Sequence, residues 1–146
     1  MVTIEQLSNE VDIQLVMLLC RDSFFDQSVA DPERIGKLAE KYANRAEVLR
    51  ASIDGETVGF AAFYANDAIN CIGFLSMIVV RREFQGFGVG REMMNEVLSR
   101  SSAVGMKMVR LNVRMDNAAA IMFYKKNGFS VEDCPDSSTF TMIKEL

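Results

Sequence analysis

The feature that most constrains this 146-residue chain is a cluster of three glycines within the segment Gln85-Gly86-Phe87-Gly88-Val89-Gly90. An apolar run over residues 74–80 precedes the cluster, and an amphipathic run from Val89 to about residue 100 follows it. Glycine accepts positive φ and lets another group approach the backbone closely. The segment therefore predicts a strand, a tight turn and a helix, with free N–H groups beside the positive end of the helix dipole. Such a turn suits a phosphate or a pyrophosphate.

The spacing of the glycines separates this turn from two other phosphate-binding turns. In the dinucleotide fingerprint the third glycine would fall at Arg91, and Arg110 stands where an acidic residue would bind ribose. The Gly-Lys-Ser/Thr sequence of a P-loop is absent. A tight connection whose glycines serve packing alone stays an alternative at this point.

The rest of the chain predicts a mixed α/β fold in one domain over residues 1–146. Asp31 with Pro32 is typical of a helix start, Asp54-Gly55 of a tight hairpin, and Gly128 of a helix end. Two crossovers fall in the C-terminal half. Strands are expected over residues 1–6, 48–53, 57–65, 71–80, 106–113, 129–132 and 139–144, and helices over residues 9–25, 32–42, 89–100 and 117–127.

Composition excludes several classes of function. The chain has no histidine, so histidine-based triads and histidine-ligated metals are ruled out. A net charge of −4 argues against general nucleic-acid binding. The three cysteines lack metal-ligand spacing, no apolar run approaches the roughly 18 residues that span a bilayer, and residues 1–5 are unlike a secretion signal. We expect a cytoplasmic protein without a metal, nucleic-acid or membrane partner.

Two segments of the chain together resemble the GNAT superfamily of acyl-CoA N-acyltransferases. Residues 85–90 match the family signature Gln/Arg-x-x-Gly-x-Gly/Ala in full. Residues 75–80 resemble the family's fourth strand, and residues 117–129, with Asn117, Phe123-Tyr124 and Gly128-Phe129, resemble its second motif. The resemblance implies a largely antiparallel sheet of six to seven strands, flanked by about four helices, whose central parallel strands are splayed. It also implies acetyl-CoA as the acyl donor.

The resemblance assigns the cofactor contacts to two segments. The backbone of Ile78, Val79 and Val80 would pair with the pantetheine arm of acetyl-CoA. Arg91 would add positive charge, and Asn117 would contact the cofactor or a water; a solvated helix residue and a plain helix N-cap are the respective alternatives. The N–H groups of the turn would hold the pyrophosphate, through Gln85, Gly86, Phe87, Gly88, Val89, Gly90 and Arg91.

Tyr124 matches the family's general acid, which protonates the departing thiolate. A free tyrosine has a pKa of about 10 and a thiol about 8.5, so full proton transfer is uphill by roughly 2 kcal/mol. Donation of a hydrogen bond to the thiolate is an equal expectation, and packing of the ring beneath the strands is the structural alternative. Phe123 and Phe129 are expected in the core, and Cys71 as a small buried residue of a strand.

No general base is named by the sequence. In the ribosomal-protein N-terminal alanine acetyltransferases a glutamate lies five residues before the motif's asparagine, at a position that is Asn112 here. In the histone-acetylating branch the glutamate lies on the fourth strand, at about Phe74 here. Ser76 and Tyr64 are able to orient a water. The remaining carboxylates, of which none is preferred, are Asp22, Asp26, Asp67, Glu132 and Asp133.

The expected function is transfer of an acetyl group from acetyl-CoA to a primary amine of a small molecule or peptide. The resemblance places the acceptor site on residues 24–42 and 64–70, which carry no substrate-specific motif. The alternative is a non-catalytic module that binds acyl-CoA as a sensor. A monomer and a homodimer are both compatible with the sequence, and so are acetyl and longer acyl donors.

Overall fold

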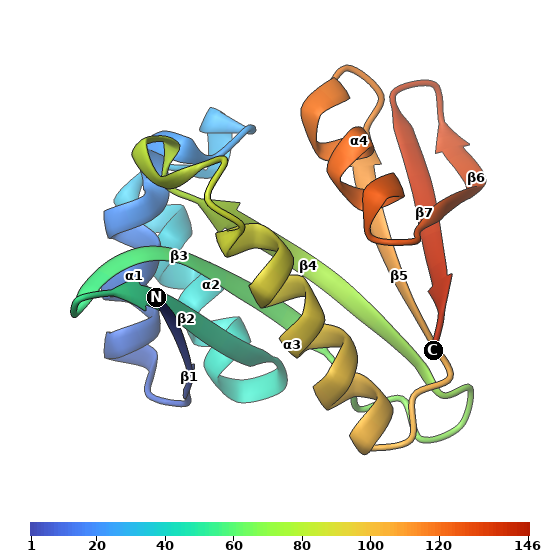
Figure 1. Cartoon of the computed structure of the whole chain (residues 1–146), viewed down its shortest axis with the longest axis horizontal. Coiled ribbons are helices and arrows are strands. Elements are labelled where there is room, and N and C mark those ends of the chain that lie inside the picture. Colours follow the sequence, from blue (N-terminus) through green and yellow to red (C-terminus); the bar gives the residue numbers. More distant parts are fainter.

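The computed structural model describes all 146 residues and contains one seven-stranded sheet (Figure 1). The strands are β1 (Val2–Leu7), β2 (Glu47–Ile53), β3 (Glu56–Tyr64), β4 (Ile72–Val80), β5 (Met108–Arg114), β6 (Ser130–Asp136) and β7 (Thr139–Glu145). The α-helices are α1 (Glu10–Cys20), α2 (Pro32–Arg45), α3 (Val89–Ala103) and α4 (Ala118–Lys126). The predicted fold class is confirmed. None of the helices is long and apolar enough to cross a membrane.

The strand order is β1-β2-β3-β4-β5-β7-β6, and only β4 and β5 pair in parallel. Their pairing is short, because it joins residues 72–75 to residues 108–111 and then stops. Beyond Leu75 and Leu111 the two strands diverge, as Figure 1 shows from the bottom of the sheet to its top. The predicted splay of the central parallel strands is therefore confirmed.

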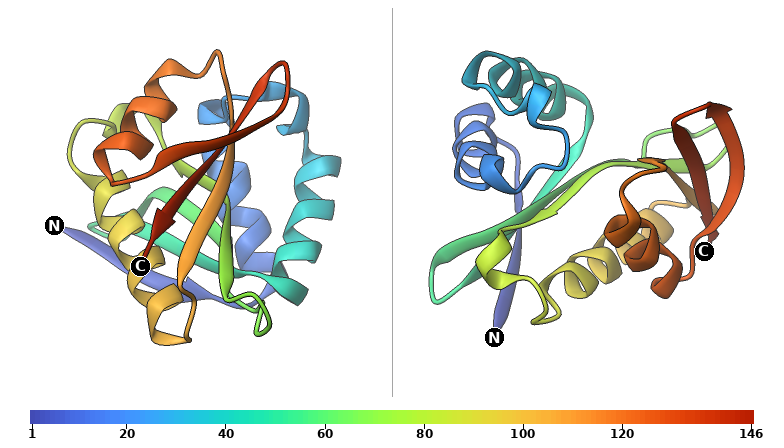
Figure 2. Two further views of the ribbon diagram at one scale, coloured as in Figure 1. Left: turned by 90° about the vertical axis from the view of Figure 1, so that its right-hand side faces the viewer. Right: turned by 90° about the horizontal axis from the view of Figure 1, so that it is seen from above.

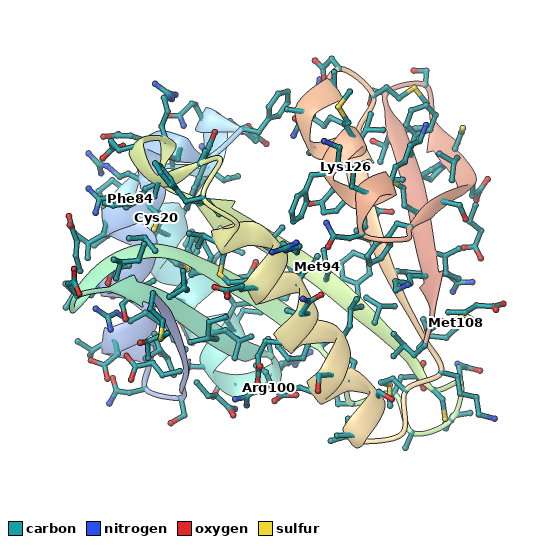
Figure 3. The ribbon with its side chains drawn as sticks, viewed as in Figure 1. Cys20, Phe84, Met94, Arg100, Met108 and Lys126 are labelled. Atoms are coloured by element: carbon teal, nitrogen blue, oxygen red, sulfur yellow. The ribbon has the colours of Figure 1, made fainter.

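The helices form a layer on each face of the sheet, with α1 and α2 on one side and α3 and α4 on the other (Figure 2). The first layer buries Met17, Tyr42 and Phe60 between α1, α2 and the sheet. The second layer buries Met94 of α3, labelled in Figure 3, and Leu111 of β5. These two apolar layers pack against both faces of β2, β3 and β4, and β5 diverges from this packed part of the sheet.

The predicted hairpin turn is confirmed. Asp54 and Gly55 both have positive φ, of 51° and 82°, as a type I′ turn requires. The first helix is shorter than predicted, ending at Cys20 instead of Phe25. It ends there because the Gln27 side chain donates hydrogen bonds to the carbonyls of Arg21 and Phe24, which replaces continued helix with two 3₁₀ turns, η1 (Arg21–Ser23) and η2 (Gln27–Val29).

The strand ends lie within one residue of the prediction except at the start of β5 and the end of β6, and Cys71 is also placed differently. Cys71 is not a buried strand residue; it is half-buried in the turn before β4 with φ of 58°. Strand β5 begins at Met108 rather than Met106, because Met106 donates its N–H to Ser101 at the end of α3. Strand β6 extends to Asp136, since pairing with β7 continues that far. The hydrogen bonds behind these differences are local, because Cys71 donates its N–H to Asp67, Met106 donates to Ser101, and Asp136 pairs with Thr139.

Candidate active site

A cleft of about 950 Å³ lies where β4 and β5 diverge. Its walls are residues 22–25 with Gln27, the end of β4 with the loop that follows, and the first part of α4. Tyr124 and all the predicted cofactor-binding residues except Phe87 line this cleft. Phe87 is 74% exposed and lines a separate hollow near Met1, so its side chain stands outside the cleft.

The glycine turn has the backbone that its sequence predicts. Gly86 and Gly88 have φ of 88° and 82°, a conformation that costs a residue with a Cβ atom roughly 1–2 kcal/mol. Helix α3 begins at this turn without a side-chain cap. Helices α1, α2 and α4 are each capped by an Asn or Asp side chain. The first N–H groups of α3 are therefore the uncapped ones, and they face a ligand-sized cleft.

Gly90 serves a different purpose from the other two glycines of the turn. It lies inside α3, and a Cβ atom there would stand 3.1 Å from Cε1 of Phe123. A contact that short is tighter than ordinary van der Waals packing. The missing side chain lets α4 approach the beginning of α3, which closes one wall of the cleft.

The side chain of Gln85 closes the turn onto β4. Its Nε2 donates a hydrogen bond to the carbonyl of Val80 at 3.0 Å. Arg91 lines the cleft and forms no ion pair. Sequence reasoning missed Arg82, which also lines the cleft and whose N–H donates to Ser23 Oγ at 3.0 Å. The pair of arginines directly after the strand, Arg81 and Arg82, was the feature of the sequence that could have indicated it.

The end of β4 presents its backbone to the cleft. Arg81 donates its N–H to the carbonyl of Val58 on β3 at 2.8 Å. Successive residues of a strand direct their N–H groups to opposite sides. Val80 and Ile78 therefore direct their N–H groups away from β3, toward the edge of β4 that no longer pairs with β5. The Val79 side chain packs into the apolar layer under α1 and α2.

Tyr124 packs against aromatic rings, as the structural alternative expects, and it also lines the cleft. Its ring lies edge-on to Phe123 at 5.6 Å and to Phe129 at 6.0 Å between ring centroids. Burial alone raises the pKa of Tyr124 to about 12. The phenol therefore stays protonated at neutral pH and is available as a hydrogen-bond donor. Of its neighbours, Phe129 is core, as predicted, whereas Phe123 is half-buried and lines the cleft.

Asn117 is the N-cap of α4, and it also lines the cleft. Its Oδ1 accepts a hydrogen bond from the N–H of Ala120 at 3.2 Å. The amide nitrogen of the same side chain has no partner among the protein's hydrogen bonds, which leaves it available to the cleft.

Two of the candidate bases are engaged in local turns. Hydrogen bonds from Ser28 lower the pKa of Asp26, and those from Asn70 lower the pKa of Asp67. A carboxylate with a lowered pKa is a weaker base. Neither residue lines the cleft, and neither do the other residues of the segment 64–70 that was expected to contribute to the acceptor site.

The other candidates separate into paired and unpaired carboxylates. Glu132 accepts hydrogen bonds from Arg110 at 2.8 and 3.3 Å, and Asp133 accepts one from the N–H of Cys134. Asp22 is the only carboxylate that lines the cleft, and it has no ion pair and no hydrogen bond. Asn112 lies outside the cleft, where its Oδ1 accepts a hydrogen bond from Thr141. No group of three or more Cys, Asp or Glu side chains is arranged to hold a metal ion.

Comparison with known proteins places this fold and cleft in a family. The Acetyltransferase (GNAT) family matches residues 14–129, so the chain belongs to the GNAT acetyltransferases. Over 85 residues it is 31% identical to an uncharacterized N-acetyltransferase of Methanocaldococcus jannaschii. That match covers 56% of this chain and 38% of the relative, so the chain spans well under two thirds of the relative's length.

Solved structures confirm the fold. A putative GNAT acetyltransferase from Desulfovibrio desulfuricans superposes with a TM-score of 0.85 at 19% identity, over 99% of each chain. PaiA N-acetyltransferase from Thermoplasma acidophilum, solved in complex with coenzyme A, superposes with a TM-score of 0.79 at 21% identity, again over 99% of each chain. The predicted superfamily is confirmed.

Proposed function

We propose that this chain, as a single domain, transfers an acetyl group from acetyl-CoA to a primary amine of a small molecule or peptide. One observation carries the proposal: the uncapped start of α3, the outward N–H groups of β4 and the phenol of Tyr124 all face one cleft. Phosphate, thioester and leaving thiolate are the three groups of acetyl-CoA that these features suit. Family membership and the relative that holds coenzyme A support the donor.

The turn would bind the pyrophosphate through the backbone. The N–H groups of Val89, Gly90 and Arg91 open α3 beside its positive dipole end, and no side chain caps them. Gly86 and Gly88 keep the turn open toward the ligand because they carry no side chain. The guanidinium groups of Arg91 and Arg82 would add charge at the same end of the cleft.

The end of β4 would bind the pantetheine arm and the thioester. The N–H of Val80 lies nearer the glycine turn, and the N–H of Ile78 lies two residues earlier in β4, farther from the turn. The thioester is the distal end of the arm, so the Ile78 N–H is the donor for its carbonyl oxygen. Removing one such donor to an oxyanion typically costs about 3 kcal/mol of transition-state stabilisation.

Tyr124 would donate a hydrogen bond to the sulfur as the C–S bond breaks. With a phenol pKa of about 12 and a free thiol at about 8.5, complete proton transfer is uphill by roughly 5 kcal/mol. Burial of the thiolate beside the same aromatic rings raises the thiol pKa too, which narrows that gap. A hydrogen bond that strengthens as charge develops on sulfur is the role that the packing favours.

The acceptor amine must lose a proton as it attacks the carbonyl carbon. An alkylammonium has a pKa of about 10.4, so a base helps at neutral pH. We propose Asp22 as the acceptor of that proton, through water, because it is the only carboxylate in the lining of the cleft. The new N–C bond then replaces the C–S bond, the proton accepted by Asp22 passes to solvent, and coenzyme A leaves as a thiolate that is hydrogen-bonded to Tyr124 and takes up a proton from solvent.

A non-catalytic sensor of acyl-CoA is the second candidate. It is favoured by Asn112 and Phe74, which occupy the positions where related branches carry a glutamate. A sensor needs the phosphate turn and β4 but has no use for Tyr124. Direct mass detection of acetylated products over a panel of polyamines, amino acids, aminosugars and peptides separates the two functions.

The decisive variant is Tyr124→Phe. We expect kcat to fall about 10- to 100-fold while acetyl-CoA affinity by calorimetry stays within two-fold, because one hydrogen bond to the leaving group is lost. Met122→Leu, at an exposed position on the same helix, is the matched control and should keep full turnover. Unchanged turnover in Tyr124→Phe would remove Tyr124 from the mechanism.

A further inference from the structure

Strand β4 carries a β-bulge at the point where the cleft begins. The pairing of β3 with β4 passes from Ala62–Met77 to Phe63–Leu75, so Ser76 is an extra residue without a partner on β3. The pairing of β4 with β5 ends at Leu75, the residue before. A bulge bends its strand and increases the local twist. The bulge at Ser76 and the divergence of β4 from β5 therefore coincide.

Ser76 forms a hydrogen bond with a residue of helix α2. Its Oγ lies 2.7 Å from the phenol oxygen of Tyr42, which is 1% exposed. No other side-chain hydrogen bond joins α1 or α2 to β4. A buried phenol without a partner is unfavourable, so each hydroxyl fixes the other. Burial raises the pKa of Tyr42 to about 12, which keeps this phenol protonated across physiological pH.

The extra residue decides which amides of β4 face the cleft. Side chains and N–H groups alternate along a strand, so a shift of one residue exchanges the two sides. With Ser76 bulged, Ile78 and Val80 direct their N–H groups toward the cleft, while Val79 packs under α1 and α2. Without the bulge, the same strand would direct Met77 and Val79 amides there.

We propose that Tyr42 is a positioning residue for acyl transfer: through its hydrogen bond with Ser76 it holds the β4 bulge and so aims the Ile78 N–H at the thioester oxygen of the donor. This inference rests on the proposed function. It extends the working site to α2, on the opposite face of the sheet from the phosphate turn (Figure 2).

Tyr64 provides a matched control within the same aromatic pair. Its ring lies edge-on to Tyr42 at 6.4 Å, and its phenol oxygen is buried without a hydrogen-bond partner. Tyr64→Phe therefore removes one buried oxygen next to Tyr42 without breaking a hydrogen bond. Tyr42→Phe and Ser76→Ala each remove one half of the 2.7 Å pair, and Ser76→Thr keeps the hydroxyl.

The test measures kcat at saturating substrates together with the Kd of coenzyme A, which lacks the acyl oxygen. We expect Tyr42→Phe and Ser76→Ala to lose at least five-fold in kcat, with the Kd of coenzyme A within two-fold of wild type. The double variant should lose no more than either single one, because the pair acts as a unit. Ser76→Thr and Tyr64→Phe should keep kcat within two-fold.

The inference is overturned if both hydroxyl deletions keep kcat within two-fold, if the Kd of coenzyme A weakens as much as kcat, or if Tyr64→Phe loses as much as Tyr42→Phe. A wild-type protein that binds acetyl-CoA but acetylates no amine contradicts the proposed function instead. The amide resonance of Ile78 then decides the inference. Its shift should differ between acetyl-CoA and coenzyme A in wild type and Tyr64→Phe but not in Tyr42→Phe; an equal difference in all three overturns it.

Discussion

The substitution Gly88→Ala tests whether the glycine turn is a phosphate cradle or merely a tight connection. Gly88 has φ of 82° and directly precedes the first residue of α3. The nearest atom to an added Cβ would be Nη2 of Arg91, at 4.0 Å. Steric contact with the protein therefore contributes almost nothing, and the cost of the substitution is the backbone conformation alone.

That cost is set by the left-handed conformation, roughly 1–2 kcal/mol for a residue with a Cβ atom. For a chain of this size it corresponds to a fall in Tm of about 2–8 °C. Gly55 has the same φ of 82° in the β2–β3 turn, with no atom within 4 Å of an added Cβ. Gly55→Ala is therefore a control with equal strain at a position remote from the cleft.

The two variants should differ in one property only. Both should lose the same few degrees in a thermal melt. Gly88→Ala should also weaken acetyl-CoA binding at least ten-fold, about 1.4 kcal/mol, because a relaxed φ turns the N–H groups at the start of α3 away from the pyrophosphate. Calorimetric titration well below either Tm measures this. If both variants bind acetyl-CoA as wild type does, the turn is not the phosphate site.

Three further predictions concern pH, thiol chemistry and packing. Turnover should rise with pH as the acceptor amine loses its proton, and it should show no descending limb below about pH 10, because burial raises the pKa of Tyr124 to about 12. Asp22→Asn should lower kcat more at pH 7 than at pH 9, and an equal loss at both pH values would exclude Asp22 as the base. Burial raises the pKa of the Cys20 thiol to about 12, so a thiol reagent at pH 8 should label the exposed Cys134 first, and mass mapping that finds Cys20 modified in folded protein would contradict its placement. Gly90→Ala should lower the free energy of unfolding by about 1–3 kcal/mol, and so lower Tm, because the added Cβ would crowd Phe123. Adding Phe123→Leu should restore part of the lost Tm. If the Tm changes of the two substitutions are additive in the double variant, the contact is refuted.

The parts of the site that were predictable from the sequence are those encoded over a few residues. Gly86 and Gly88 predict a positive φ because only glycine adopts that conformation without strain, and both residues have positive φ in the structure. Asn117 predicts a helix start because its short side chain can accept a hydrogen bond from a backbone N–H in the first helical turn, which here is that of Ala120. The strand and helix that flank the turn follow from the hydrophobic periodicity, so the backbone at the glycine-turn end of the cleft was predictable before the fold was known.

The parts that escaped sequence reasoning depend on contacts across long separations in the chain. The loop after the first helix is held to the segment after β4, because the N–H of Arg82 donates a hydrogen bond to Ser23 Oγ across 59 positions of the chain. That arrangement brings Asp22 and Arg82 into the cleft. Nothing local distinguished Asp22 from the four other candidate carboxylates, because the difference is which of them the fold leaves without a partner.

The sequence alone determined a glycine turn, the strand before it and the helix after it, in a spacing that resembles the GNAT signature. Local backbone preferences depend on the residue type and act over a few residues, so they can be predicted from the sequence. The tertiary structure alone decided the shape of the reacting end. A one-residue bulge at Ser76 and a phenol from α2 determine where β4 parts from β5, because strand register and buried hydrogen bonds are settled only when distant segments pack together.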